Sequence, residues 1–147
     1  MRLQKDLKEF IGLLNSTKVE YLLVGGHAVA YHGFPRFTGD IDFFIGYSKG
    51  NLSRVQSVLA DFGLPSLAAQ VPDCSAGAIF QLGRPPHRIA LLTKIDGVSF
   101  EEAWQDRERA TIDGLEMWIL SKALLSQNKR ASGRPKDLED LRQLEGK

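Results

Sequence analysis

The 147-residue sequence has little cysteine and no long apolar segment. Its single cysteine, Cys74, has no partner for an internal disulfide, which agrees with a reducing compartment. No apolar run approaches the roughly 18 residues that a membrane-spanning helix needs. The opening stretch MRLQKDLKEF also lacks the uninterrupted apolar core of a signal peptide. These absences predict a cytoplasmic protein without a membrane partner.

Strong net charge and several familiar catalytic motifs are absent as well. The formal net charge is +1, so any attraction for RNA or DNA must be local. There is no G-x-S-x-G elbow and no Walker A motif, and Cys74 has no evident histidine partner in sequence. The three histidines show no zinc-ligand spacing. These observations argue against hydrolase, P-loop and zinc chemistry.

The patterns that are present predict one domain over residues 1–147, because this length suits a single core. Helical spacing predicts helices at 2–15, at about 51–62 and at 135–144. Asn51 or Ser53 is the expected cap of the second of these. Two further helices should begin after the Ser99 capping box and after Ser121. Alternation predicts strands at 21–24, 40–45, 78–82 and 87–93 and a hairpin at 111–119, with 64–76 mainly loop. Strands 78–82 and 87–93 should pair antiparallel beside strand 40–45.

The stretch from Tyr21 to Ile45 carries the chemistry. It reads as a buried strand, a Gly25-Gly26 turn, a short helix from His27, a loop, and a strand with Asp40 and Asp42. Side chains two apart on a strand share a face, so the two carboxylates should converge. Two carboxylates at such short range resist joint ionisation, and a bound Mg²⁺ or Mn²⁺ would relieve the repulsion between them. Glycine backbone at a helix start suits a phosphate. The stretch therefore predicts a metal–nucleotide site.

These residues resemble a known family. A hydrophobic strand, Gly25-Gly26, a short helix, Arg36-x-Thr38 and Asp40-Ile41-Asp42 together are similar to the signature of the polymerase-β-type nucleotidyltransferase superfamily, in its minimal, AbiEii-toxin-like and toxin–antitoxin-associated branch. The resemblance covers most of the chain and is strongest at 21–45, 81–104 and 126–141. It implies an α/β (α+β) fold of the polymerase-β-like type, with a mixed sheet flanked by helices.

The resemblance also implies an activity. A nucleoside monophosphate would pass from an NTP to a hydroxyl acceptor with release of pyrophosphate. Asp40 and Asp42 would be the metal ligands, and Gly25 and Gly26 would hold phosphate. Related minimal enzymes modify tRNA ends or protein side chains and often belong to toxin–antitoxin or phage-defence pairs. The expected partners are thus an NTP, a tRNA or protein acceptor, and a cognate toxin or antitoxin.

One expected residue is missing. In the superfamily a third acid on a neighbouring strand completes a second metal site and can act as base. The minimal branch reads there like R-I-D-L-L-T ahead of G-V-S-F-E-E-A-W, whereas this chain has RIALLT at 88–93 before GVSFEEAW. Ala90 stands in the place of the acid, by natural loss or by replacement, which predicts nucleotide binding with impaired transfer. Asp96, in the expected Asp96-Gly97 turn, is the nearest substitute.

A basic segment follows. Residues 121–136 contain no acid, and the stretch NKRASGRPKD at 128–137 is similar to a C-terminal signature of the same family. Lys129, Arg134 and Lys136 are therefore candidate contacts for a triphosphate or an RNA backbone. The alternative is a solvated connection between helices.

Three further residues have two interpretations. Arg36 and Thr38 either contact phosphate or ribose, or belong to a loop packed by its aromatic residues. His27 either lines the nucleotide pocket or is structural. Two alternatives to an enzyme also stay open: a non-catalytic nucleotide-binding or partner-binding module, and an antitoxin-like interaction subunit that binds no nucleotide.

Overall fold

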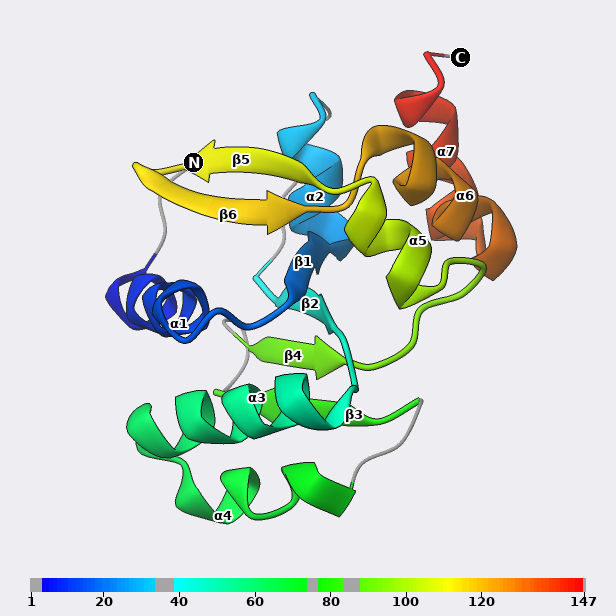
Figure 1. Cartoon of the computed structure of the whole chain (residues 1–147). Helices are drawn as coiled ribbons and strands as arrows, with labels where there is room; N and C mark the ends of the chain where they lie inside the picture. Colours follow the sequence, from blue (N-terminus) through cyan, green and yellow to red (C-terminus); the bar gives the residue numbers. More distant parts are fainter. Residues whose placement is uncertain (1–3, 34–38, 74–76, 84–87, 147) are drawn as a thin grey trace.

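The computed structural model describes residues 4–33, 39–73, 77–83 and 88–146 (Figure 1). Arg36, Thr38 and Cys74 fall outside these ranges, so the predictions made for them stay predictions.

The described residues form helices around one sheet, as predicted. The helices are α1 (Lys5–Ser16), α2 (Gly25–Tyr31), α3 (Lys49–Asp61), α4 (Pro65–Ala68), α5 (Phe100–Gln105), α6 (Lys122–Ser132) and α7 (Pro135–Leu144). The strands are β1 (Tyr21–Val24), β2 (Ile41–Ile45), β3 (Ile79–Leu82), β4 (Ile89–Leu92), β5 (Glu108–Ile112) and β6 (Leu115–Ile119). Their order in the sheet is β3-β4-β2-β1-β6-β5. The α/β (α+β) class with a mixed sheet flanked by helices is confirmed.

Strand pairing sets the positions of the candidate residues. β1 runs antiparallel to β2, and β4 runs parallel to β2 on its other side. β3 and β4 pair antiparallel, as the sequence predicts. The register places Asp42 between Val24 of β1 and Ala90 of β4. Asp42 therefore lies between β1, which leads into Gly25, and β4, which carries Ala90.

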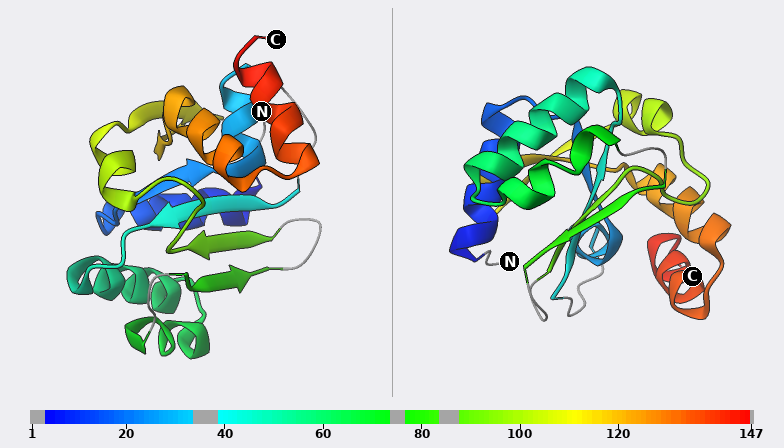
Figure 2. Two further views of the ribbon diagram at one scale, coloured as in Figure 1. Left: turned by 90° about the vertical axis from the view of Figure 1, so that its right-hand side faces the viewer. Right: turned by 90° about the horizontal axis from the view of Figure 1, so that it is seen from below.

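Helices cover both faces of the sheet. On one face, the Phe10 ring of α1 lies 6.3 Å from that of Phe43 and 5.2 Å from that of Phe62 at the end of α3. On the other face, Phe44 packs edge-on against Phe100 of α5, with ring centroids 5.1 Å apart. Figure 2 shows α3 and α4 on one side of the sheet and α6 and α7 on the other. Burial of alternate strand residues on opposite faces thus produces a layered core.

The predicted cap of α3 is wrong. Ser48 is the N-cap, and its hydroxyl accepts a hydrogen bond from the Asn51 N–H at 3.2 Å. Asn51 instead lies inside the helix, fully buried. Its amide oxygen accepts from the Glu20 N–H at 2.7 Å, and its amide nitrogen donates to the carbonyls of Glu20 (3.1 Å) and Gly46 (2.6 Å). Asn51 therefore joins α3 to the start of β1 and the end of β2.

The structure corrects the prediction for residues 64–76 and the start of the hairpin, and it confirms two predicted helix caps. Residues 64–76, expected to be mainly loop, contain α4 and a 3₁₀ turn at Val71–Asp73, because Pro65 is placed at the first helical position it favours. The hairpin begins at Glu108, three residues before the predicted start at Thr111. The Ser99 capping box and the Ser121 cap are confirmed.

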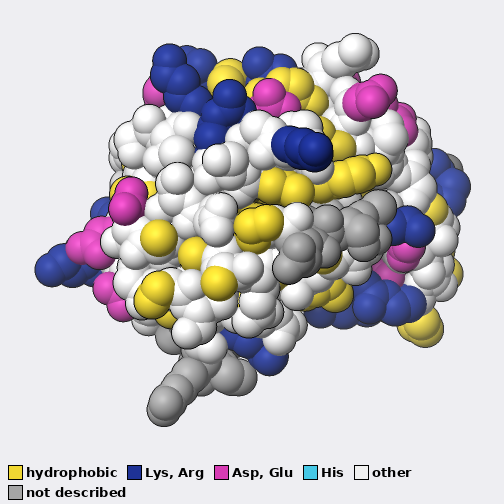
Figure 3. Space-filling model, turned by 60° about the horizontal axis from the view of Figure 1, so that its bottom comes forward, with side chains coloured by type: hydrophobic (Ala, Val, Ile, Leu, Met, Phe, Trp, Pro, Cys, Tyr) yellow, Lys and Arg dark blue, Asp and Glu magenta, His cyan; other side chains and the backbone are white. Residues whose placement is uncertain are grey.

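The face that α3 and α4 present carries few charged side chains (Figure 3). In the sequence, Asp61 and Asp73 are the only charged residues between Val55 and Gly83. The site residues predicted from the sequence all come from other segments of the chain. Among the described residues, no helix combines the length and apolar character that crossing a bilayer requires.

We predict that Asn51→Ala lowers the free energy of unfolding by about 2–3 kcal/mol, because it leaves the buried groups of Glu20 and Gly46 without their partner. Urea unfolding measures the change. Ser53→Ala, on the exposed side of the same helix, is the matched control and should stay within about 0.5 kcal/mol of the parent. Equal midpoints for the two variants would contradict this role of Asn51.

Candidate functional site

A cavity of about 500 Å³ lies between the sheet and the α6–α7 pair. Sheet residues form one wall, the start of α2 forms its end, and the helix pair forms the opposite wall. Its lining includes Val24, Gly25, Gly26, Asp42, Ile79, Leu92, Lys94, Ile95, Asp96, Asn128, Lys129, Ser132, Arg134, Lys136 and Asp137. The volume is within the range of small-molecule sites, roughly 300–1,000 Å³. Segments distant in sequence thus meet around one space.

Gly25 and Asp42 are in direct contact at one end of the cavity. Gly25 has φ +70, and a Cβ built on it would lie 2.5 Å from Oδ2 of Asp42. A side chain is therefore opposed both by the backbone conformation and by the carboxylate. α2 begins at Gly25, so the two glycines are its first residues rather than a turn ahead of His27. Because α2 has only seven residues, its backbone N–H groups matter more than its dipole.

The Asp42 carboxylate lies in an electrostatically mixed environment. Burial raises its pKa, and the negative charge of Asp40 raises it further, whereas Lys129 and Lys136 act in the opposite direction. Asp40 immediately precedes β2, and its side chain is 46% exposed. One of its oxygens accepts the Arg88 N–H at 3.2 Å, and the other lies 3.6 Å from the Arg88 guanidinium. The charge of Asp40 thus acts on Asp42, but of these two acids only Asp42 lines the cavity.

Ala90 is the strand neighbour of Asp42. In the parallel pairing of β2 and β4 the two are register partners, so their side chains lie on the same face of the sheet. Gln81 of β3 is paired with Ala90 on the other side. Within the part of the chain that the structure describes, no three acidic, histidine or cysteine side chains gather as a metal site. The position next to Asp42 therefore contributes a methyl group.

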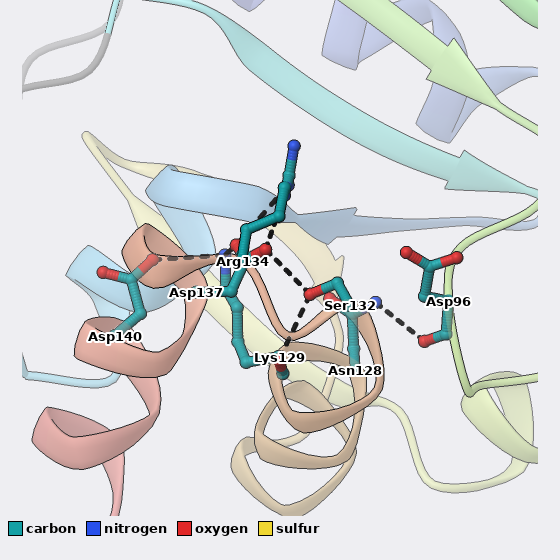
Figure 4. A network of polar contacts seen from close by, with 7 residues as sticks. All are labelled: Asp96, Asn128, Lys129, Ser132, Arg134, Asp137 and Asp140. Carbon is teal, nitrogen blue, oxygen red and sulfur yellow. Dashed lines mark hydrogen bonds and ion pairs between the residues drawn. The ribbon is translucent and has the colours of Figure 1, made fainter.

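Lys129 does not lie in a solvated connection. It is on α6, nearly buried, and its ammonium lies 3.4 Å from Asp137 and 3.2 Å from Asp140, both of α7 (Figure 4). Asp137 also accepts hydrogen bonds from the Ser132 hydroxyl at 2.9 Å and from Arg134 Nε at 2.6 Å. The Arg134 side chain is nevertheless 76% exposed. An ion cluster thus joins α6 to α7 at the cavity wall.

Asp137 and Asp140 were missed as site residues in the sequence, although a signal exists. Both lie on the buried side of α7 with Leu141 and Leu144, so two acids share the face of an amphipathic helix that packs inward. Leu138 of the same helix is 41% exposed. Acids on an apolar helix face need buried counter-charges, which points to Lys129.

Asp96 is brought into the cavity, whereas His27 is not among the lining residues. The backbone oxygen of Asp96 accepts from the Asn128 amide at 2.9 Å, and that of Gly97 accepts from Gln127 at 2.7 Å. Asp96 does not complete a three-acid cluster with Asp40 and Asp42. His27 is buried, burial lowers its pKa, and its Nδ1 has no hydrogen-bond partner among the described residues.

Comparison with known families supports one class. Over residues 1–145, the chain matches a family described as "Nucleotidyltransferase of unknown function (DUF6036)". The match extends from α1 through α7 and so includes both walls of the cavity. A search of curated proteins found no match.

We predict that Asp137→Asn lowers the free energy of unfolding by about 3 kcal/mol at pH 7, because it deprives the buried Lys129 of one counter-charge. Chemical unfolding measures it, with Glu139→Gln of the exposed Glu139–Arg142 pair as the control that should be nearly neutral.

Asp137 also predicts a pH dependence. Burial alone would raise the pKa of Asp137, but the hydrogen bonds from Arg134 and Ser132 and the charge of Lys129 outweigh burial and lower its pKa to about 2. The unfolded chain therefore takes up this proton first as the pH falls. The stabilisation is complete above about pH 4 and is lost toward pH 2. A parent protein and an Asp137→Asn variant with the same loss of stability over this window would contradict the assignment.

Proposed function

Because this chain belongs to the family of nucleotidyltransferases of unknown function (DUF6036), we propose that it binds an NTP with Mg²⁺ or Mn²⁺ and transfers its nucleoside monophosphate to a hydroxyl acceptor. The observation that carries this proposal is the cavity in which Asp42 packs against Gly25 opposite Lys129, Arg134 and Lys136. Carboxylates, glycine backbone and cations around one space suit a triphosphate with its metal.

The donor set fits one divalent ion. Asp40 and Asp42 offer carboxylate oxygens, the ligands that Mg²⁺ prefers. Burial and the charge of Asp40 raise the pKa of Asp42, and a bound divalent cation would offset both effects. The described residues offer no third acid beside them. When bound, the ion would neutralise charge on the phosphates. The remaining coordination would come from the triphosphate and water.

The basic residues have different tasks in this proposal. Lys129 is held by Asp137 and Asp140, so it presents its charge near Asp42 from a fixed position. Lys136 also acts on Asp42, and the exposed Arg134 can reach a phosphate with its guanidinium fork. These three side chains provide positive charge on the wall opposite the sheet, where the phosphates would otherwise be uncompensated.

Transfer should be slow. The acceptor oxygen must form a bond to the α-phosphorus as the bond to pyrophosphate breaks, and its proton must leave. Ala90 contributes no base on the strand beside Asp42. Loss of a positioned base costs about 10²–10⁴ in rate. Nucleotide binding would be much less affected, because Asp40, Asp42 and the cations remain.

Ala90 specifically favours a second candidate: a nucleotide-binding or partner-binding module of a toxin–antitoxin-type system that has lost catalysis. For the enzyme, a tRNA end or a protein hydroxyl is the proposed acceptor. Metal-dependent NTP binding without labelled product on either acceptor would favour the module. Absence of any metal-dependent nucleotide binding would favour an interaction subunit instead.

We predict that Ala90→Asp raises nucleotidyl transfer by about 10²–10⁴-fold, because the new carboxylate would lie beside Asp42 on the same sheet face. Labelled NTP incubated with total tRNA, and separately with protein acceptors, measures it.

The double variant Ala90→Asp with Asp42→Asn should lose this gain, and Gln81→Asp, one strand further from Asp42, should not produce it. If Ala90→Asp binds Mg-NTP but transfers no more label than the parent, Ala90 is not the catalytic deficit.

We predict that Gly25→Ala weakens Mg-NTP binding at least about tenfold, since the added methyl would displace the Asp42 carboxylate and strain the backbone. Calorimetric titration measures the affinity. Gly12→Ala is the matched control, because Gly12 has no neighbour within 4 Å of the added methyl and lies within α1. Unchanged binding in Gly25→Ala would show that this contact does not shape the site.

A further inference from the structure

The two ends of the cavity differ in chemistry. Gly25, Gly26 and Asp42 lie at the end beside Ala90, whereas Leu92 and its partner Ile79 lie two residues further along β4, toward Ile95 and Asp96. Asp96 follows Ala90 by six residues, and β4 ends at Leu92, so at about 3.3 Å per strand residue the chain leads away from Asp42. The charges that shift the Asp42 pKa come from Asp40, Lys129 and Lys136, whereas Asp96 acts on Arg134. Asp96 therefore belongs to the end remote from the proposed metal ligands.

The remote end has an apolar shelf. Ile79 of the edge strand β3 is 61% exposed although it lines the cavity. Its register partner is Leu92 of β4, so both side chains lie on the same face of the sheet. Ile95 continues the apolar surface beyond β4. Leu92 and Ile95 are partly buried against the core, so Ile79 is the exposed member of the three. Branched apolar side chains that line a cavity favour a flat apolar group packed over them.

Asp96 adds a carboxylate to this shelf, near Lys94 and Asn128 in the cavity lining, and its backbone is held in place. Asn128 holds its backbone oxygen, and a Cβ on the neighbouring Gly97 would lie 2.4 Å from the Ala131 Cβ of α6, so the loop is tightly packed on that helix. Figure 4 shows the carboxylate turned away from the Asn128 bond. It accepts no hydrogen bond from any described residue, and an ionised carboxylate only accepts.

We infer that this end is the nucleoside subsite, where the base lies on Ile79, Leu92 and Ile95 and the Asp96 carboxylate accepts a hydrogen bond from an exocyclic amino group. The inference rests on the proposed function and adds a base preference to it. Adenine, guanine and cytosine carry such an amino group, whereas uracil presents a carbonyl oxygen in the corresponding place. The subsite therefore discriminates against uracil, because two acceptors would face each other.

The test compares CTP with UTP, which have the same size and the same triphosphate. Binding in Mg²⁺ is measured by calorimetry, with inorganic tripolyphosphate as a probe of the phosphate end alone. The parent should bind UTP about tenfold more weakly than CTP. Asp96→Asn should bring the ratio to about one or invert it, because an amide can donate to the uracil carbonyl. Asp61→Asn, the same change at the exposed end of α3, should keep the parent ratio.

The shelf has its own variant. Ile79→Ser should weaken CTP and UTP by a similar factor and leave tripolyphosphate binding unchanged. The inference would be overturned if the parent bound CTP and UTP equally, or if the tenfold ratio persisted in Asp96→Asn. In either case, binding of tripolyphosphate would leave the proposed function intact. Failure of tripolyphosphate and all four NTPs to bind would overturn the proposed function and this inference together.

Discussion

Asp42 packs so closely against Gly25 that no side chain fits between them, and the rest of the cavity is arranged around this contact. The antiparallel pairing of β1 with β2 places Val24 opposite Asp42, so the chain must turn sharply at the next residue to begin α2. Only glycine adopts the required positive φ without strain while leaving space for the carboxylate. One backbone position thereby sets both the start of a helix and the place of an acid.

The opposite wall depends on a buried cation. A nearly buried ammonium group is costly unless it is paired, and Lys129 has Asp137 and Asp140 as its counter-charges. The three residues join α6 to α7 and hold the Lys129 ammonium in place, where its charge lowers the pKa of Asp42. The cavity therefore combines Asp42, whose pKa is raised by burial, with Lys129, which Asp137 and Asp140 hold in place. This opposition of charges accounts for the affinity for a metal–triphosphate that we propose.

Local patterns in the sequence predict most of the fold, because strand alternation, glycine turns and serine caps act over a few residues. The antiparallel pair beside β2 was predictable in this way, whereas the place of Ala90 next to the Asp42 strand was expected from the family resemblance. Tertiary contacts account for the failures. Asn51 has the chemistry of a cap, but three hydrogen bonds to Glu20 and Gly46 place it inside α3. A basic run without acids indicates solvent exposure, and Lys129 departs from it because its counter-charges come from the following helix.

The origin of those counter-charges has a consequence for how the protein is made. The ribosome adds α6 to the chain before α7, so a chain that ends between the two helices has Lys129 without Asp137 and Asp140. A nascent chain halted there would carry an uncompensated ammonium and an open wall beside Asp42. The helical wall of the cavity can therefore form only after Asp140, the last acid of the cluster, has been added to the chain.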